Sequence, residues 1–159
     1  YAHGNQPIQH MVYLYNYANQ PWKAQYWSRK IMDKLYSGTE NGYPGDEDQG
    51  QTSSWYVLSA MGFYSVTPGT GEYVMGSPKF KKTTISLENG KKFIIQAPLN
   101  SSSNVYIKSA NLNGKNFTRN FLTYKDLTEG GMLNLEMDET PNKNRGLLSQ
   151  DKPFSLTKN

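Results

Sequence analysis

Three carboxylates stand next to one another in a segment whose residue types suit acid–base chemistry. Asp46, Glu47 and Asp48 lie between Gly45 and Gly50, directly ahead of a predicted helix. Like charges this close raise one another's pKa, and the N-terminus of a following helix stabilises whichever carboxylate stays ionised. A loop of this kind can hold a carboxylate as a general base against a water molecule. Acidic runs also occur in ordinary solvated loops, so the pattern by itself leaves both interpretations open.

A polar turn near the start of the chain is the second group that could take part in chemistry. Asn5 and Gln6 carry amide oxygens, which suit a hard cation such as calcium better than a transition metal. The same residues are also a good helix cap, which is the plainer interpretation. The pair His3 and His10 does not predict a zinc site, because Pro7 lies between them and disfavours one continuous helix. The acidic segment, in turn, lacks the ligand spacing of an EF-hand loop.

Composition and motifs exclude several other functions. The chain has no Cys, which excludes disulfides, thiolate metal sites and cysteine nucleophiles. It has neither a Gly-x-Ser-x-Gly elbow nor a phosphate-binding loop. The net charge is +4, but the basic excess lies after residue 77 and is scattered beside apolar runs, so no nucleic-acid partner is predicted. No membrane span is predicted either, and because no leader precedes Tyr1 we expect a longer protein.

The residues before position 64 have the apolar spacing of helices. Three helices are expected over residues 7–18, 21–36 and 51–63, with a loop over 38–50. Pro7 and Pro21 suit the first position of a helix, and Gly62 suits the end of the third. The first helix is expected to bury an apolar stripe that includes Met11 and Leu14. The first two helices should form a hairpin.

The pattern changes near residue 66 to short alternating runs typical of an antiparallel sheet. Strands are expected over residues 72–75, 83–87, 92–97, 105–109, 111–112 and 132–137. Asn89-Gly90 and Asn113-Gly114 predict turns between neighbouring strands. Residues 141–159 have little periodicity and are expected to form a surface tail or to be disordered. Since each element leaves an apolar face that needs a partner, a preceding part of the protein is expected to cover them.

These segments resemble glycoside hydrolase family 92, the calcium-dependent exo-α-mannosidases of gut Bacteroidetes. The matching segments are HGNQPIQHMVYLYNYANQPWKAQYW, GYPGDEDQGQTSSWYVLSAMGFYSVTPGTGEYVMGSP, NGKNFTRNFLTYKDLTEGGMLNLEM and PNKNRG, which cover nearly the whole chain in order. The resemblance implies an α+β fold made of terminal helices of an (α/α)6 barrel followed by antiparallel β-sandwich strands. Residues 1–64 would be the C-terminal barrel helices with the base loop, 65–140 the strands and 141–159 an irregular tail.

The resemblance also implies a mechanism, inverting hydrolysis of an α-mannoside. Asp46 and Asp48 match the family's base positions, and Asp48 is preferred because it lies nearer the third helix. Calcium held partly by Asn5 and Gln6 would bind the sugar hydroxyls, with His3 and Glu47 as further sugar contacts. The family often has Glu in place of Gln6, which removes a charge beside the metal. Its general acid lies on an earlier segment, so the isolated chain is expected to be inactive.

The implied setting is a secreted or periplasmic enzyme acting on α-mannosides of N-glycans or mannan, with α-1,2 linkages favoured, and with the missing N-terminal part as its main partner. One alternative is a non-catalytic carbohydrate-binding or structural β-module that places sugar on Tyr73, Phe93 or Tyr106 of the sheet. Another is a helical scaffold for protein partners, supported only by exposed Tyr and Trp. The first alternative puts ligand contacts on the strands, whereas the enzyme interpretation puts them all before residue 60.

Overall fold

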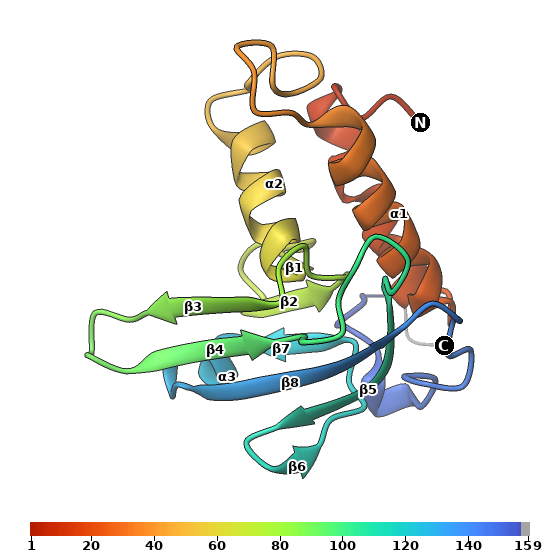
Figure 1. Ribbon diagram of the computed structural model, residues 1–159, viewed down its shortest axis with the longest axis vertical. Helices are drawn as coiled ribbons and strands as arrows, with labels where there is room; N and C mark the ends of the chain where they lie inside the picture. Colours follow the sequence, from red (N-terminus) through yellow and green to blue (C-terminus); the bar gives the residue numbers. More distant parts are fainter. Residues whose placement is uncertain (157–159) are drawn as a thin grey trace.

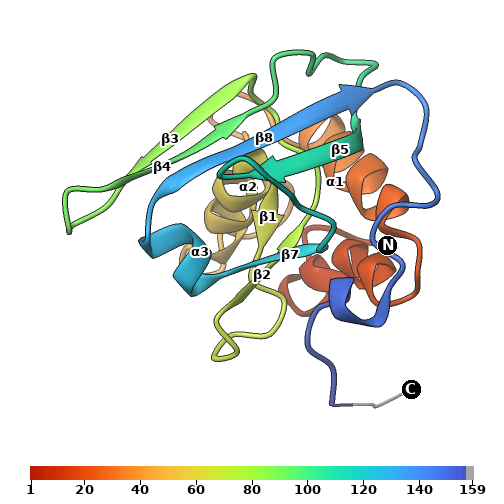
Figure 2. The ribbon, with the colours of Figure 1, turned by 90° about the horizontal axis from the view of Figure 1, so that it is seen from below.

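The computed structural model describes residues 1–156 and has an α+β fold. Helices η1 (Gln6–Asn16), α1 (Pro21–Leu35) and α2 (Gln51–Met61) stand together above the strands (Figure 1). Seen from below, both sheets lie on the near side of α2 (Figure 2). Among the described residues no helix is both long and apolar enough to cross a bilayer.

The three predicted helices form close to their expected bounds. Pro7 and Pro21 occupy the first turns of η1 and α1, where the missing N–H has no partner to lose. α2 ends at Gly62, whose N–H donates to the carbonyls of Leu58 and Ser59. η1 differs from expectation in being a 3₁₀ helix, the tighter form with three residues per turn.

The prediction that Met11 and Leu14 face the interior is wrong. Met11 and Leu14 are exposed, whereas the polar residues Gln9 and Asn16 are buried. The reason is hydrogen bonding to distant segments. The Asn16 amide donates to the carbonyls of Tyr13 and Met75, and the Gln9 amide to the carbonyl of His3 and the hydroxyl of Thr52. The N–H groups of both buried amides find partners in this way, although Oε1 of Gln9 has no partner among the described residues. Periodicity alone therefore misplaces the face.

The strands form two sheets. β1 (Phe63–Tyr64), β2 (Glu72–Met75) and β7 (Phe121–Thr123) make a small antiparallel sheet. The larger sheet has the order β3-β4-β8-β5-β6, with bounds Lys82–Ser86, Lys92–Gln96, Gly131–Asp138, Tyr106–Leu112 and Lys115–Asn116. β4 and β8 pair in parallel, so the prediction of a wholly antiparallel sheet is wrong. β8 lies between β4 and β5, which both precede it in the sequence. No local sequence pattern encodes this pairing.

Turn chemistry is predicted correctly, and short elements are not. Asn89-Gly90 joins β3 to β4, and Asn113 and Gly114 both have positive φ, 52° and 84°, between β5 and β6. Two positive φ angles define the type I′ hairpin turn that Asn-Gly favours. Strands β1 and β7 and helix α3 (Tyr124–Thr128) were not expected, because two to five residues carry almost no periodicity.

The tail packs on the segment that joins β6 to β7. Arg145 and Asp151 are buried. Arg145 donates to the carbonyls of Phe117 and Arg119, and Asp151 accepts from the hydroxyl of Thr118. Of the two expected outcomes, the packed one therefore holds around residues 145–153, while residues 154–156 are exposed and residues 157–159 lie outside the described part.

Two apolar clusters hold these parts. One lies among the strands and includes Phe93, Ile95, Leu133 and Leu135. The other lies among the helices around Trp55 and reaches β1 and β2 through Tyr64 and Val74. Leu58 of α2 packs against both clusters, so the helix that follows the acidic loop is anchored on each side.

Candidate active site

The polar turn and the acidic loop touch backbone to backbone, through Gly4 and Gly45. A Cβ added to Gly4 would lie 3.0 Å from both the Cα and the N of Gly45, closer than side chains normally approach. Gly45 itself has φ +72°, which only glycine adopts without strain. The two segments, forty residues apart in sequence, are therefore held together by a contact that admits glycine alone.

The acidic loop reverses direction through three consecutive left-handed residues. Asp48, Gln49 and Gly50 have φ angles of 56°, 57° and 98°. The left-handed conformation costs a non-glycine residue on the order of 1 kcal/mol or more, and consecutive cases are unusual. Such strain concentrates at functional sites. The turn lets α2 begin at once, with the N–H of Thr52 donating to the carbonyl of Glu47 at 3.2 Å.

An open hollow of about 430 Å³ lies beside this turn, and Asp48 and Gln6 both line it. Its other walls are residues of the loop, of α2 and of the segment after β1: Gln49, Gly50, Gln51, Ser54, Leu58, Tyr64, Ser65 and Pro68. Among residues 1–156, no Lys or Arg lines it. The structure thus brings together one predicted base residue and one predicted metal-binding residue. Asp46 and Asn5 have exposed side chains on the same two segments and do not line the hollow.

Glu47 points to the helix rather than to the hollow. Its carboxylate accepts hydrogen bonds from the backbone N–H groups of Gly50 and Ser53 at the start of α2. Hydrogen bonding from Ser53, on its side chain and its backbone, and from Gly50 lowers the pKa of Glu47. A carboxylate at a helix N-terminus satisfies free N–H groups and complements the helix dipole. The structure therefore gives Glu47 a capping position, and its predicted sugar contact remains a proposal.

His3 lies inside the protein, 2% exposed, under the polar turn. Its Nδ1 is 2.7 Å from the hydroxyl of Tyr1, and its Nε2 is 2.8 Å from the hydroxyl of Tyr36. Its ring meets Trp55 edge to face at 4.2 Å between centroids. Burial lowers the pKa of His3 to about 4, so the imidazole is neutral near pH 7. A sugar hydroxyl would have to displace one of these two tyrosines to reach His3.

The donors at the hollow are suited to a hard cation but do not form a complete site. Gln6 and Asp48 at the hollow, and Asn5 on the same turn as Gln6, offer side-chain oxygens. Oxygen is the ligand atom that calcium prefers, and calcium takes six to eight such ligands. Gln6 donates its Nε2 to Oε1 of Gln51 at 2.7 Å, an orientation that turns its own oxygen away from that bond. Within residues 1–156, no group of three or more His, Cys, Asp or Glu side chains could hold a metal. The oxygens present fit calcium as part of a larger ligand set.

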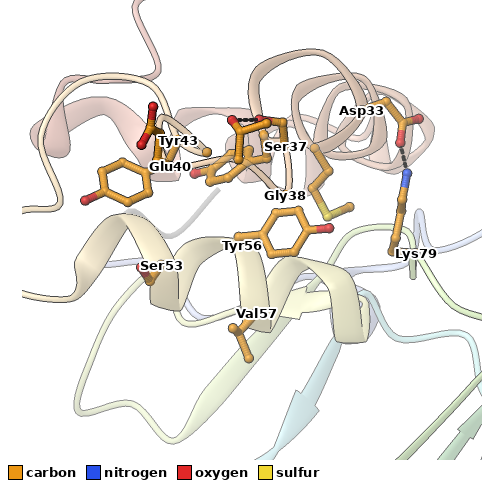
Figure 3. Close-up of a pocket in the computed structure, with 13 residues that line it drawn as sticks. Asp33, Ser37, Gly38, Glu40, Tyr43, Ser53, Tyr56, Val57 and Lys79 are labelled. Carbon is orange, nitrogen blue, oxygen red and sulfur yellow. Dashed lines mark hydrogen bonds and ion pairs between the residues drawn. The ribbon is translucent and has the colours of Figure 1, made fainter.

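A second hollow, of about 590 Å³, lies on the other side of α2. Figure 3 shows it between the loop from Ser37 to Tyr43 and the outer side of α2, with the ion pair of Asp33 and Lys79 at one end. Val57 and Tyr43 are exposed there. None of the predicted site residues lines this hollow.

The sheet does not offer the aromatic platform that a carbohydrate-binding module would use. Phe93 is 0% exposed in the strand cluster, and Tyr73 packs against the same cluster. Tyr106 is half-buried at the edge where β5 begins. Because stacking on a sugar needs an open ring face, this alternative loses its main residue.

Sequence reasoning missed three residues that hold the loop: Gln9, Tyr36 and Thr52. Thr52 is fully buried and donates its hydroxyl to the carbonyl of Asp46 at 2.8 Å. Gln9 donates to that hydroxyl at 3.1 Å, and the Tyr36 hydroxyl donates to the carbonyl of Thr52 at 3.3 Å. The available signal was a polar residue on an otherwise apolar helical face, which Gln9 and Thr52 both are.

A carboxylate on a strained loop beside an open, oxygen-lined hollow is a site of the kind that hydrolases use. Residues 1–139 match the model of the glycosyl hydrolase family 92 catalytic domain. The chain therefore belongs to glycosyl hydrolase family 92, as the sequence motifs predicted.

Solved structures and a curated relative agree with this family. The chain is similar to an inverting family 92 mannosidase of Bacteroides thetaiotaomicron, with 57% identity, a TM-score of 0.93, and coverage of 98% of this chain and 21% of that one. A family 92 α-mannosidase of the same organism, also solved with mannoimidazole, is 39% identical with a TM-score of 0.93, over 98% of this chain and 21% of that one. An uncharacterized secreted glycosidase of Arthroderma benhamiae is 31% identical over 84% of this chain and 18% of its own length. The chain thus spans about a fifth of each relative.

Proposed function

We propose that this chain is the C-terminal, base-bearing part of an inverting exo-α-mannosidase. The observation that carries the proposal is the junction of the two motifs: Gly4 contacts Gly45, and Gln6 and Asp48 line one hollow. This arrangement puts a carboxylate and a neutral oxygen donor on one wall of an open cavity. The similarity to an inverting mannosidase over 98% of this chain supports the same chemistry.

In this proposal Asp48, assisted by Asp46, takes the proton of the water that displaces the sugar. An inverting enzyme needs its acid and base carboxyl groups roughly 6.5–9.5 Å apart, so that a water fits beside the ring. Asp48 lies on the cavity wall, and no Lys or Arg of the described residues lines that wall to neutralise its charge. The acid is supplied by a segment outside residues 1–159, and His3 and Glu47 support the sugar-binding side of the loop.

Calcium is the cofactor we propose, held in part by Asn5 and Gln6. When bound, calcium polarises neighbouring sugar hydroxyls and favours a distorted ring. The protein's own contribution is orientation: the bond from Gln6 to Gln51 fixes the amide of Gln6 against the start of α2. Since Gln6 is neutral, we expect a weaker site than one with Glu at this position.

The helices are proposed to be the last ones of an (α/α)6 barrel, whose other helices come from the rest of the enzyme. Large apolar side chains stay exposed on their outer faces: Met11, Leu14, Trp27 and Val57. Exposed apolar area of this extent usually marks an interface. We therefore expect the isolated chain to self-associate and to be inactive, because it lacks the acid.

The proposed substrate is an α-mannoside of N-glycans or mannan, with α-1,2 linkages favoured, met outside the cytoplasm in the periplasm or the medium. A relative named as a secreted glycosidase supports this location. The linkage preference depends on the part of the cavity that contacts the leaving sugar. Loops outside this chain would form that part.

The test is hydrolysis of linkage-defined mannobioses by the full-length enzyme, with the anomer released followed by NMR. Asp48→Asn and Asp46→Asn keep size and lose the base, and we expect the rate to fall by about 10²–10⁴-fold for the residue that is the base. Asp33→Asn is the matched control, since Asp33 pairs with Lys79 on the surface outside the 430 Å³ hollow. If both loop variants hydrolyse at the wild-type rate, the proposal is wrong.

Chelation tests the cofactor separately. We expect EDTA to abolish hydrolysis and added calcium to restore it. A rate unchanged by chelator would remove calcium from the proposal while leaving the base in place.

A further inference from the structure

Four polar side chains form a network beneath the acidic loop, where the interior is otherwise apolar. Gln9 and Thr52 are 0% exposed and His3 is 2% exposed. Tyr36 is the fourth member, and its ring stacks on Trp55 with 5.8 Å between ring centroids and an interplanar angle of 9°. Burying polar groups costs free energy unless each finds a partner, so a network in this place calls for a reason beyond packing.

The direction of each proton in this network follows from its partners. Asp46 offers a carbonyl to Thr52, so the Thr52 hydroxyl must donate there, at 2.8 Å. The same oxygen therefore accepts from the amide of Gln9 at 3.1 Å. Gln9 is itself fixed, because its backbone carbonyl accepts the Trp55 indole N–H at 3.0 Å. Thr52 thus connects the loop to a rigid, fully buried support.

The histidine branch has one direction as well. The Tyr36 hydroxyl donates to the carbonyl of Thr52 at 3.3 Å, so it accepts from Nε2–H of His3 at 2.8 Å. Nδ1 of His3 then accepts from the Tyr1 hydroxyl at 2.7 Å. This assigns the Nε2–H tautomer to His3. Both branches end at Thr52: the histidine branch at its backbone carbonyl, and the Gln9 branch at the hydroxyl that bonds the loop.

We propose that Thr52 is a positioning residue for the catalytic loop: its hydroxyl fixes the carbonyl of Asp46, and so sets the orientation of the left-handed turn that presents Asp48. This inference rests on the proposed function. The geometry carries it, because the peptide that Thr52 holds belongs to one predicted base residue and lies two residues from the other. A displacement of about 1 Å in a reacting group can cost on the order of 10²-fold in rate.

The test compares Thr52→Val with Thr52→Ser in the full-length enzyme. Valine keeps the shape and removes the hydroxyl, while the Gln9 amide keeps its bond to the carbonyl of His3. We expect kcat to fall by about 10–100-fold with KM within about twofold, since the carboxylates that the turn presents are proposed to act on the attacking water. Serine restores the hydroxyl and should return kcat to within about threefold of wild type. A wild-type kcat for Thr52→Val, or equal loss in both variants, would overturn the inference.

Tyr36→Phe provides an independent variant in case Thr52→Val does not fold. Phenylalanine keeps the ring against Trp55 and removes the bond to the carbonyl of Thr52. A lower kcat at constant KM supports the network, and an unchanged kcat contradicts it. Measuring Asp46→Asn and Asp48→Asn alongside distinguishes the positioning role from the proposed function. An inactive Asp48→Asn with a fully active Thr52→Val refutes the positioning role alone. Fully active Asp46→Asn and Asp48→Asn refute the proposed function.

Discussion

The helical region and the sheet region of this molecule are stabilised in different ways. Buried polar residues are concentrated in the helices and the turn before them: His3, Gln9, Asn16, Gln25, Ser28, Arg29, Thr52 and Ser59. Within the described chain, none of the buried polar residues lies in a strand, and those after residue 62 belong to loops and the tail. The sheet is packed by alternating apolar side chains, whereas the helices are packed and also hydrogen-bonded in their interior.

The difference has a physical consequence. Apolar burial stabilises in proportion to area and tolerates small shifts, while a buried hydrogen bond requires a partner at a fixed distance and angle. The helical region therefore fixes positions, and the sheet region supplies stability. The acidic loop is attached to the first of these, through Thr52 and through Gly4.

The most direct test of this difference is to remove one large, buried side chain from each region. Phe93→Ala removes a fully buried ring from the strand cluster and should cost about 3–5 kcal/mol of stability. Because Phe93 lies away from the loop, we expect kcat of the folded enzyme at 25 °C to be unchanged. Trp55→Ala should cost a similar amount and should also lower kcat. The indole N–H of Trp55 donates to the backbone carbonyl of Gln9, and its ring packs against His3. Equal kcat values for the two variants would show that the regions do not differ; urea midpoints give the stability readout.

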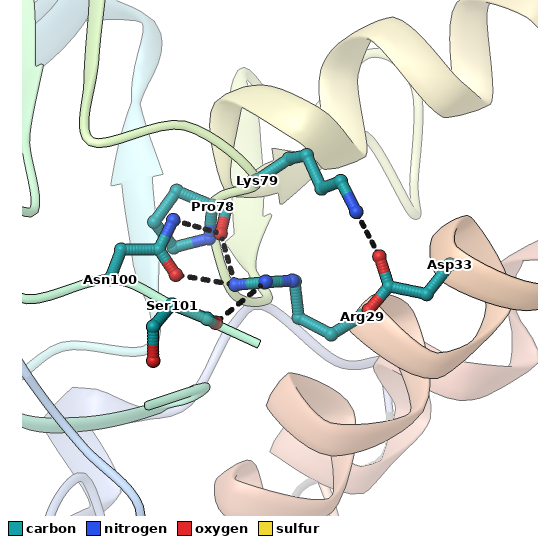
Figure 4. A network of polar contacts seen from close by, with 6 residues as sticks. All are labelled: Arg29, Asp33, Pro78, Lys79, Asn100 and Ser101. Atoms are coloured by element: carbon teal, nitrogen blue, oxygen red, sulfur yellow. Dashed lines mark hydrogen bonds and ion pairs between the residues drawn. The ribbon is translucent and has the colours of Figure 1, made fainter. Parts of the chain in front are cut away.

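Arg29 joins the two regions, and its replacement tests the junction. From α1 its guanidinium donates to the carbonyls of Pro78 and Ser101 and to Oδ1 of Asn100 (Figure 4). Burial is the main cause that lowers the pKa of Arg29. Arg29→Met removes the donor from the carbonyl of Ser101 and from Oδ1 of Asn100, while the carbonyl of Pro78 keeps its bond from the Asn100 amide. The substitution should cost about 3 kcal/mol. Arg29→Lys should recover little of it, because an ammonium cannot span three acceptors as a planar guanidinium does.

A contrasting result would be informative. If Arg29→Lys melts at the wild-type temperature, the charge alone is what matters and the directional account of the helical region is wrong. Asp33→Asn, which breaks only the neighbouring surface pair with Lys79, is the matched control and should cost less than about 1 kcal/mol.

Local chemistry explains how much of the fold was predictable. The start of α2, the stop signal at Gly62 and the turn at Asn113-Gly114 depend on neighbouring residues, and all three were predicted correctly. The parallel pairing of β4 with β8 joins segments separated by three further strands. Nothing near either strand encodes it, and the prediction of antiparallel pairing failed there.

The same distinction applies to the site. The loop could be singled out from its carboxylates alone, but its support could not, because Gln9 and Thr52 are 43 residues apart and the contact of Gly4 with Gly45 appears only in the fold. Met11 and Leu14 are exposed for the same reason. Because the long-range contacts bury Gln9, the face of the helix that carries Met11 and Leu14 points to solvent. The roles assigned to Asp46, Asp48, Asn5 and Gln6 stay predictions.

The buried imidazole makes the helical region the pH-sensitive one. Burial lowers the pKa of His3 to about 4 from its ordinary 6.5. The unfolded chain therefore binds more protons between these values, so the stability is fully present above about pH 6.5 and is lost as the pH falls toward 4. We expect a loss of at most about 3 kcal/mol over this range.

Melting temperatures between pH 4 and 7, with chelator present throughout so that calcium binding does not contribute, measure this effect. His3→Gln should show a flatter profile over the same range. Phe93→Ala, which leaves His3 in place, should keep the wild-type slope. A slope that survives in His3→Gln would assign the pH dependence to other groups.

The smallest effect is expected at a helix cap in the sheet region. Thr123 begins α3 with a capping box, in which its hydroxyl accepts the N–H of Asp126 at 3.1 Å and the carboxylate of Asp126 accepts the N–H of Thr123 at 2.8 Å. Thr123→Ala should cost about 1 kcal/mol, and Thr123→Ser should cost little. Since α3 lies against β7 and far along the chain from the acidic loop, kcat should stay at the wild-type value in both variants. A fall in kcat for Thr123→Ala would mean that even small strains in the sheet reach the loop, and the separation of positioning from stability would not hold.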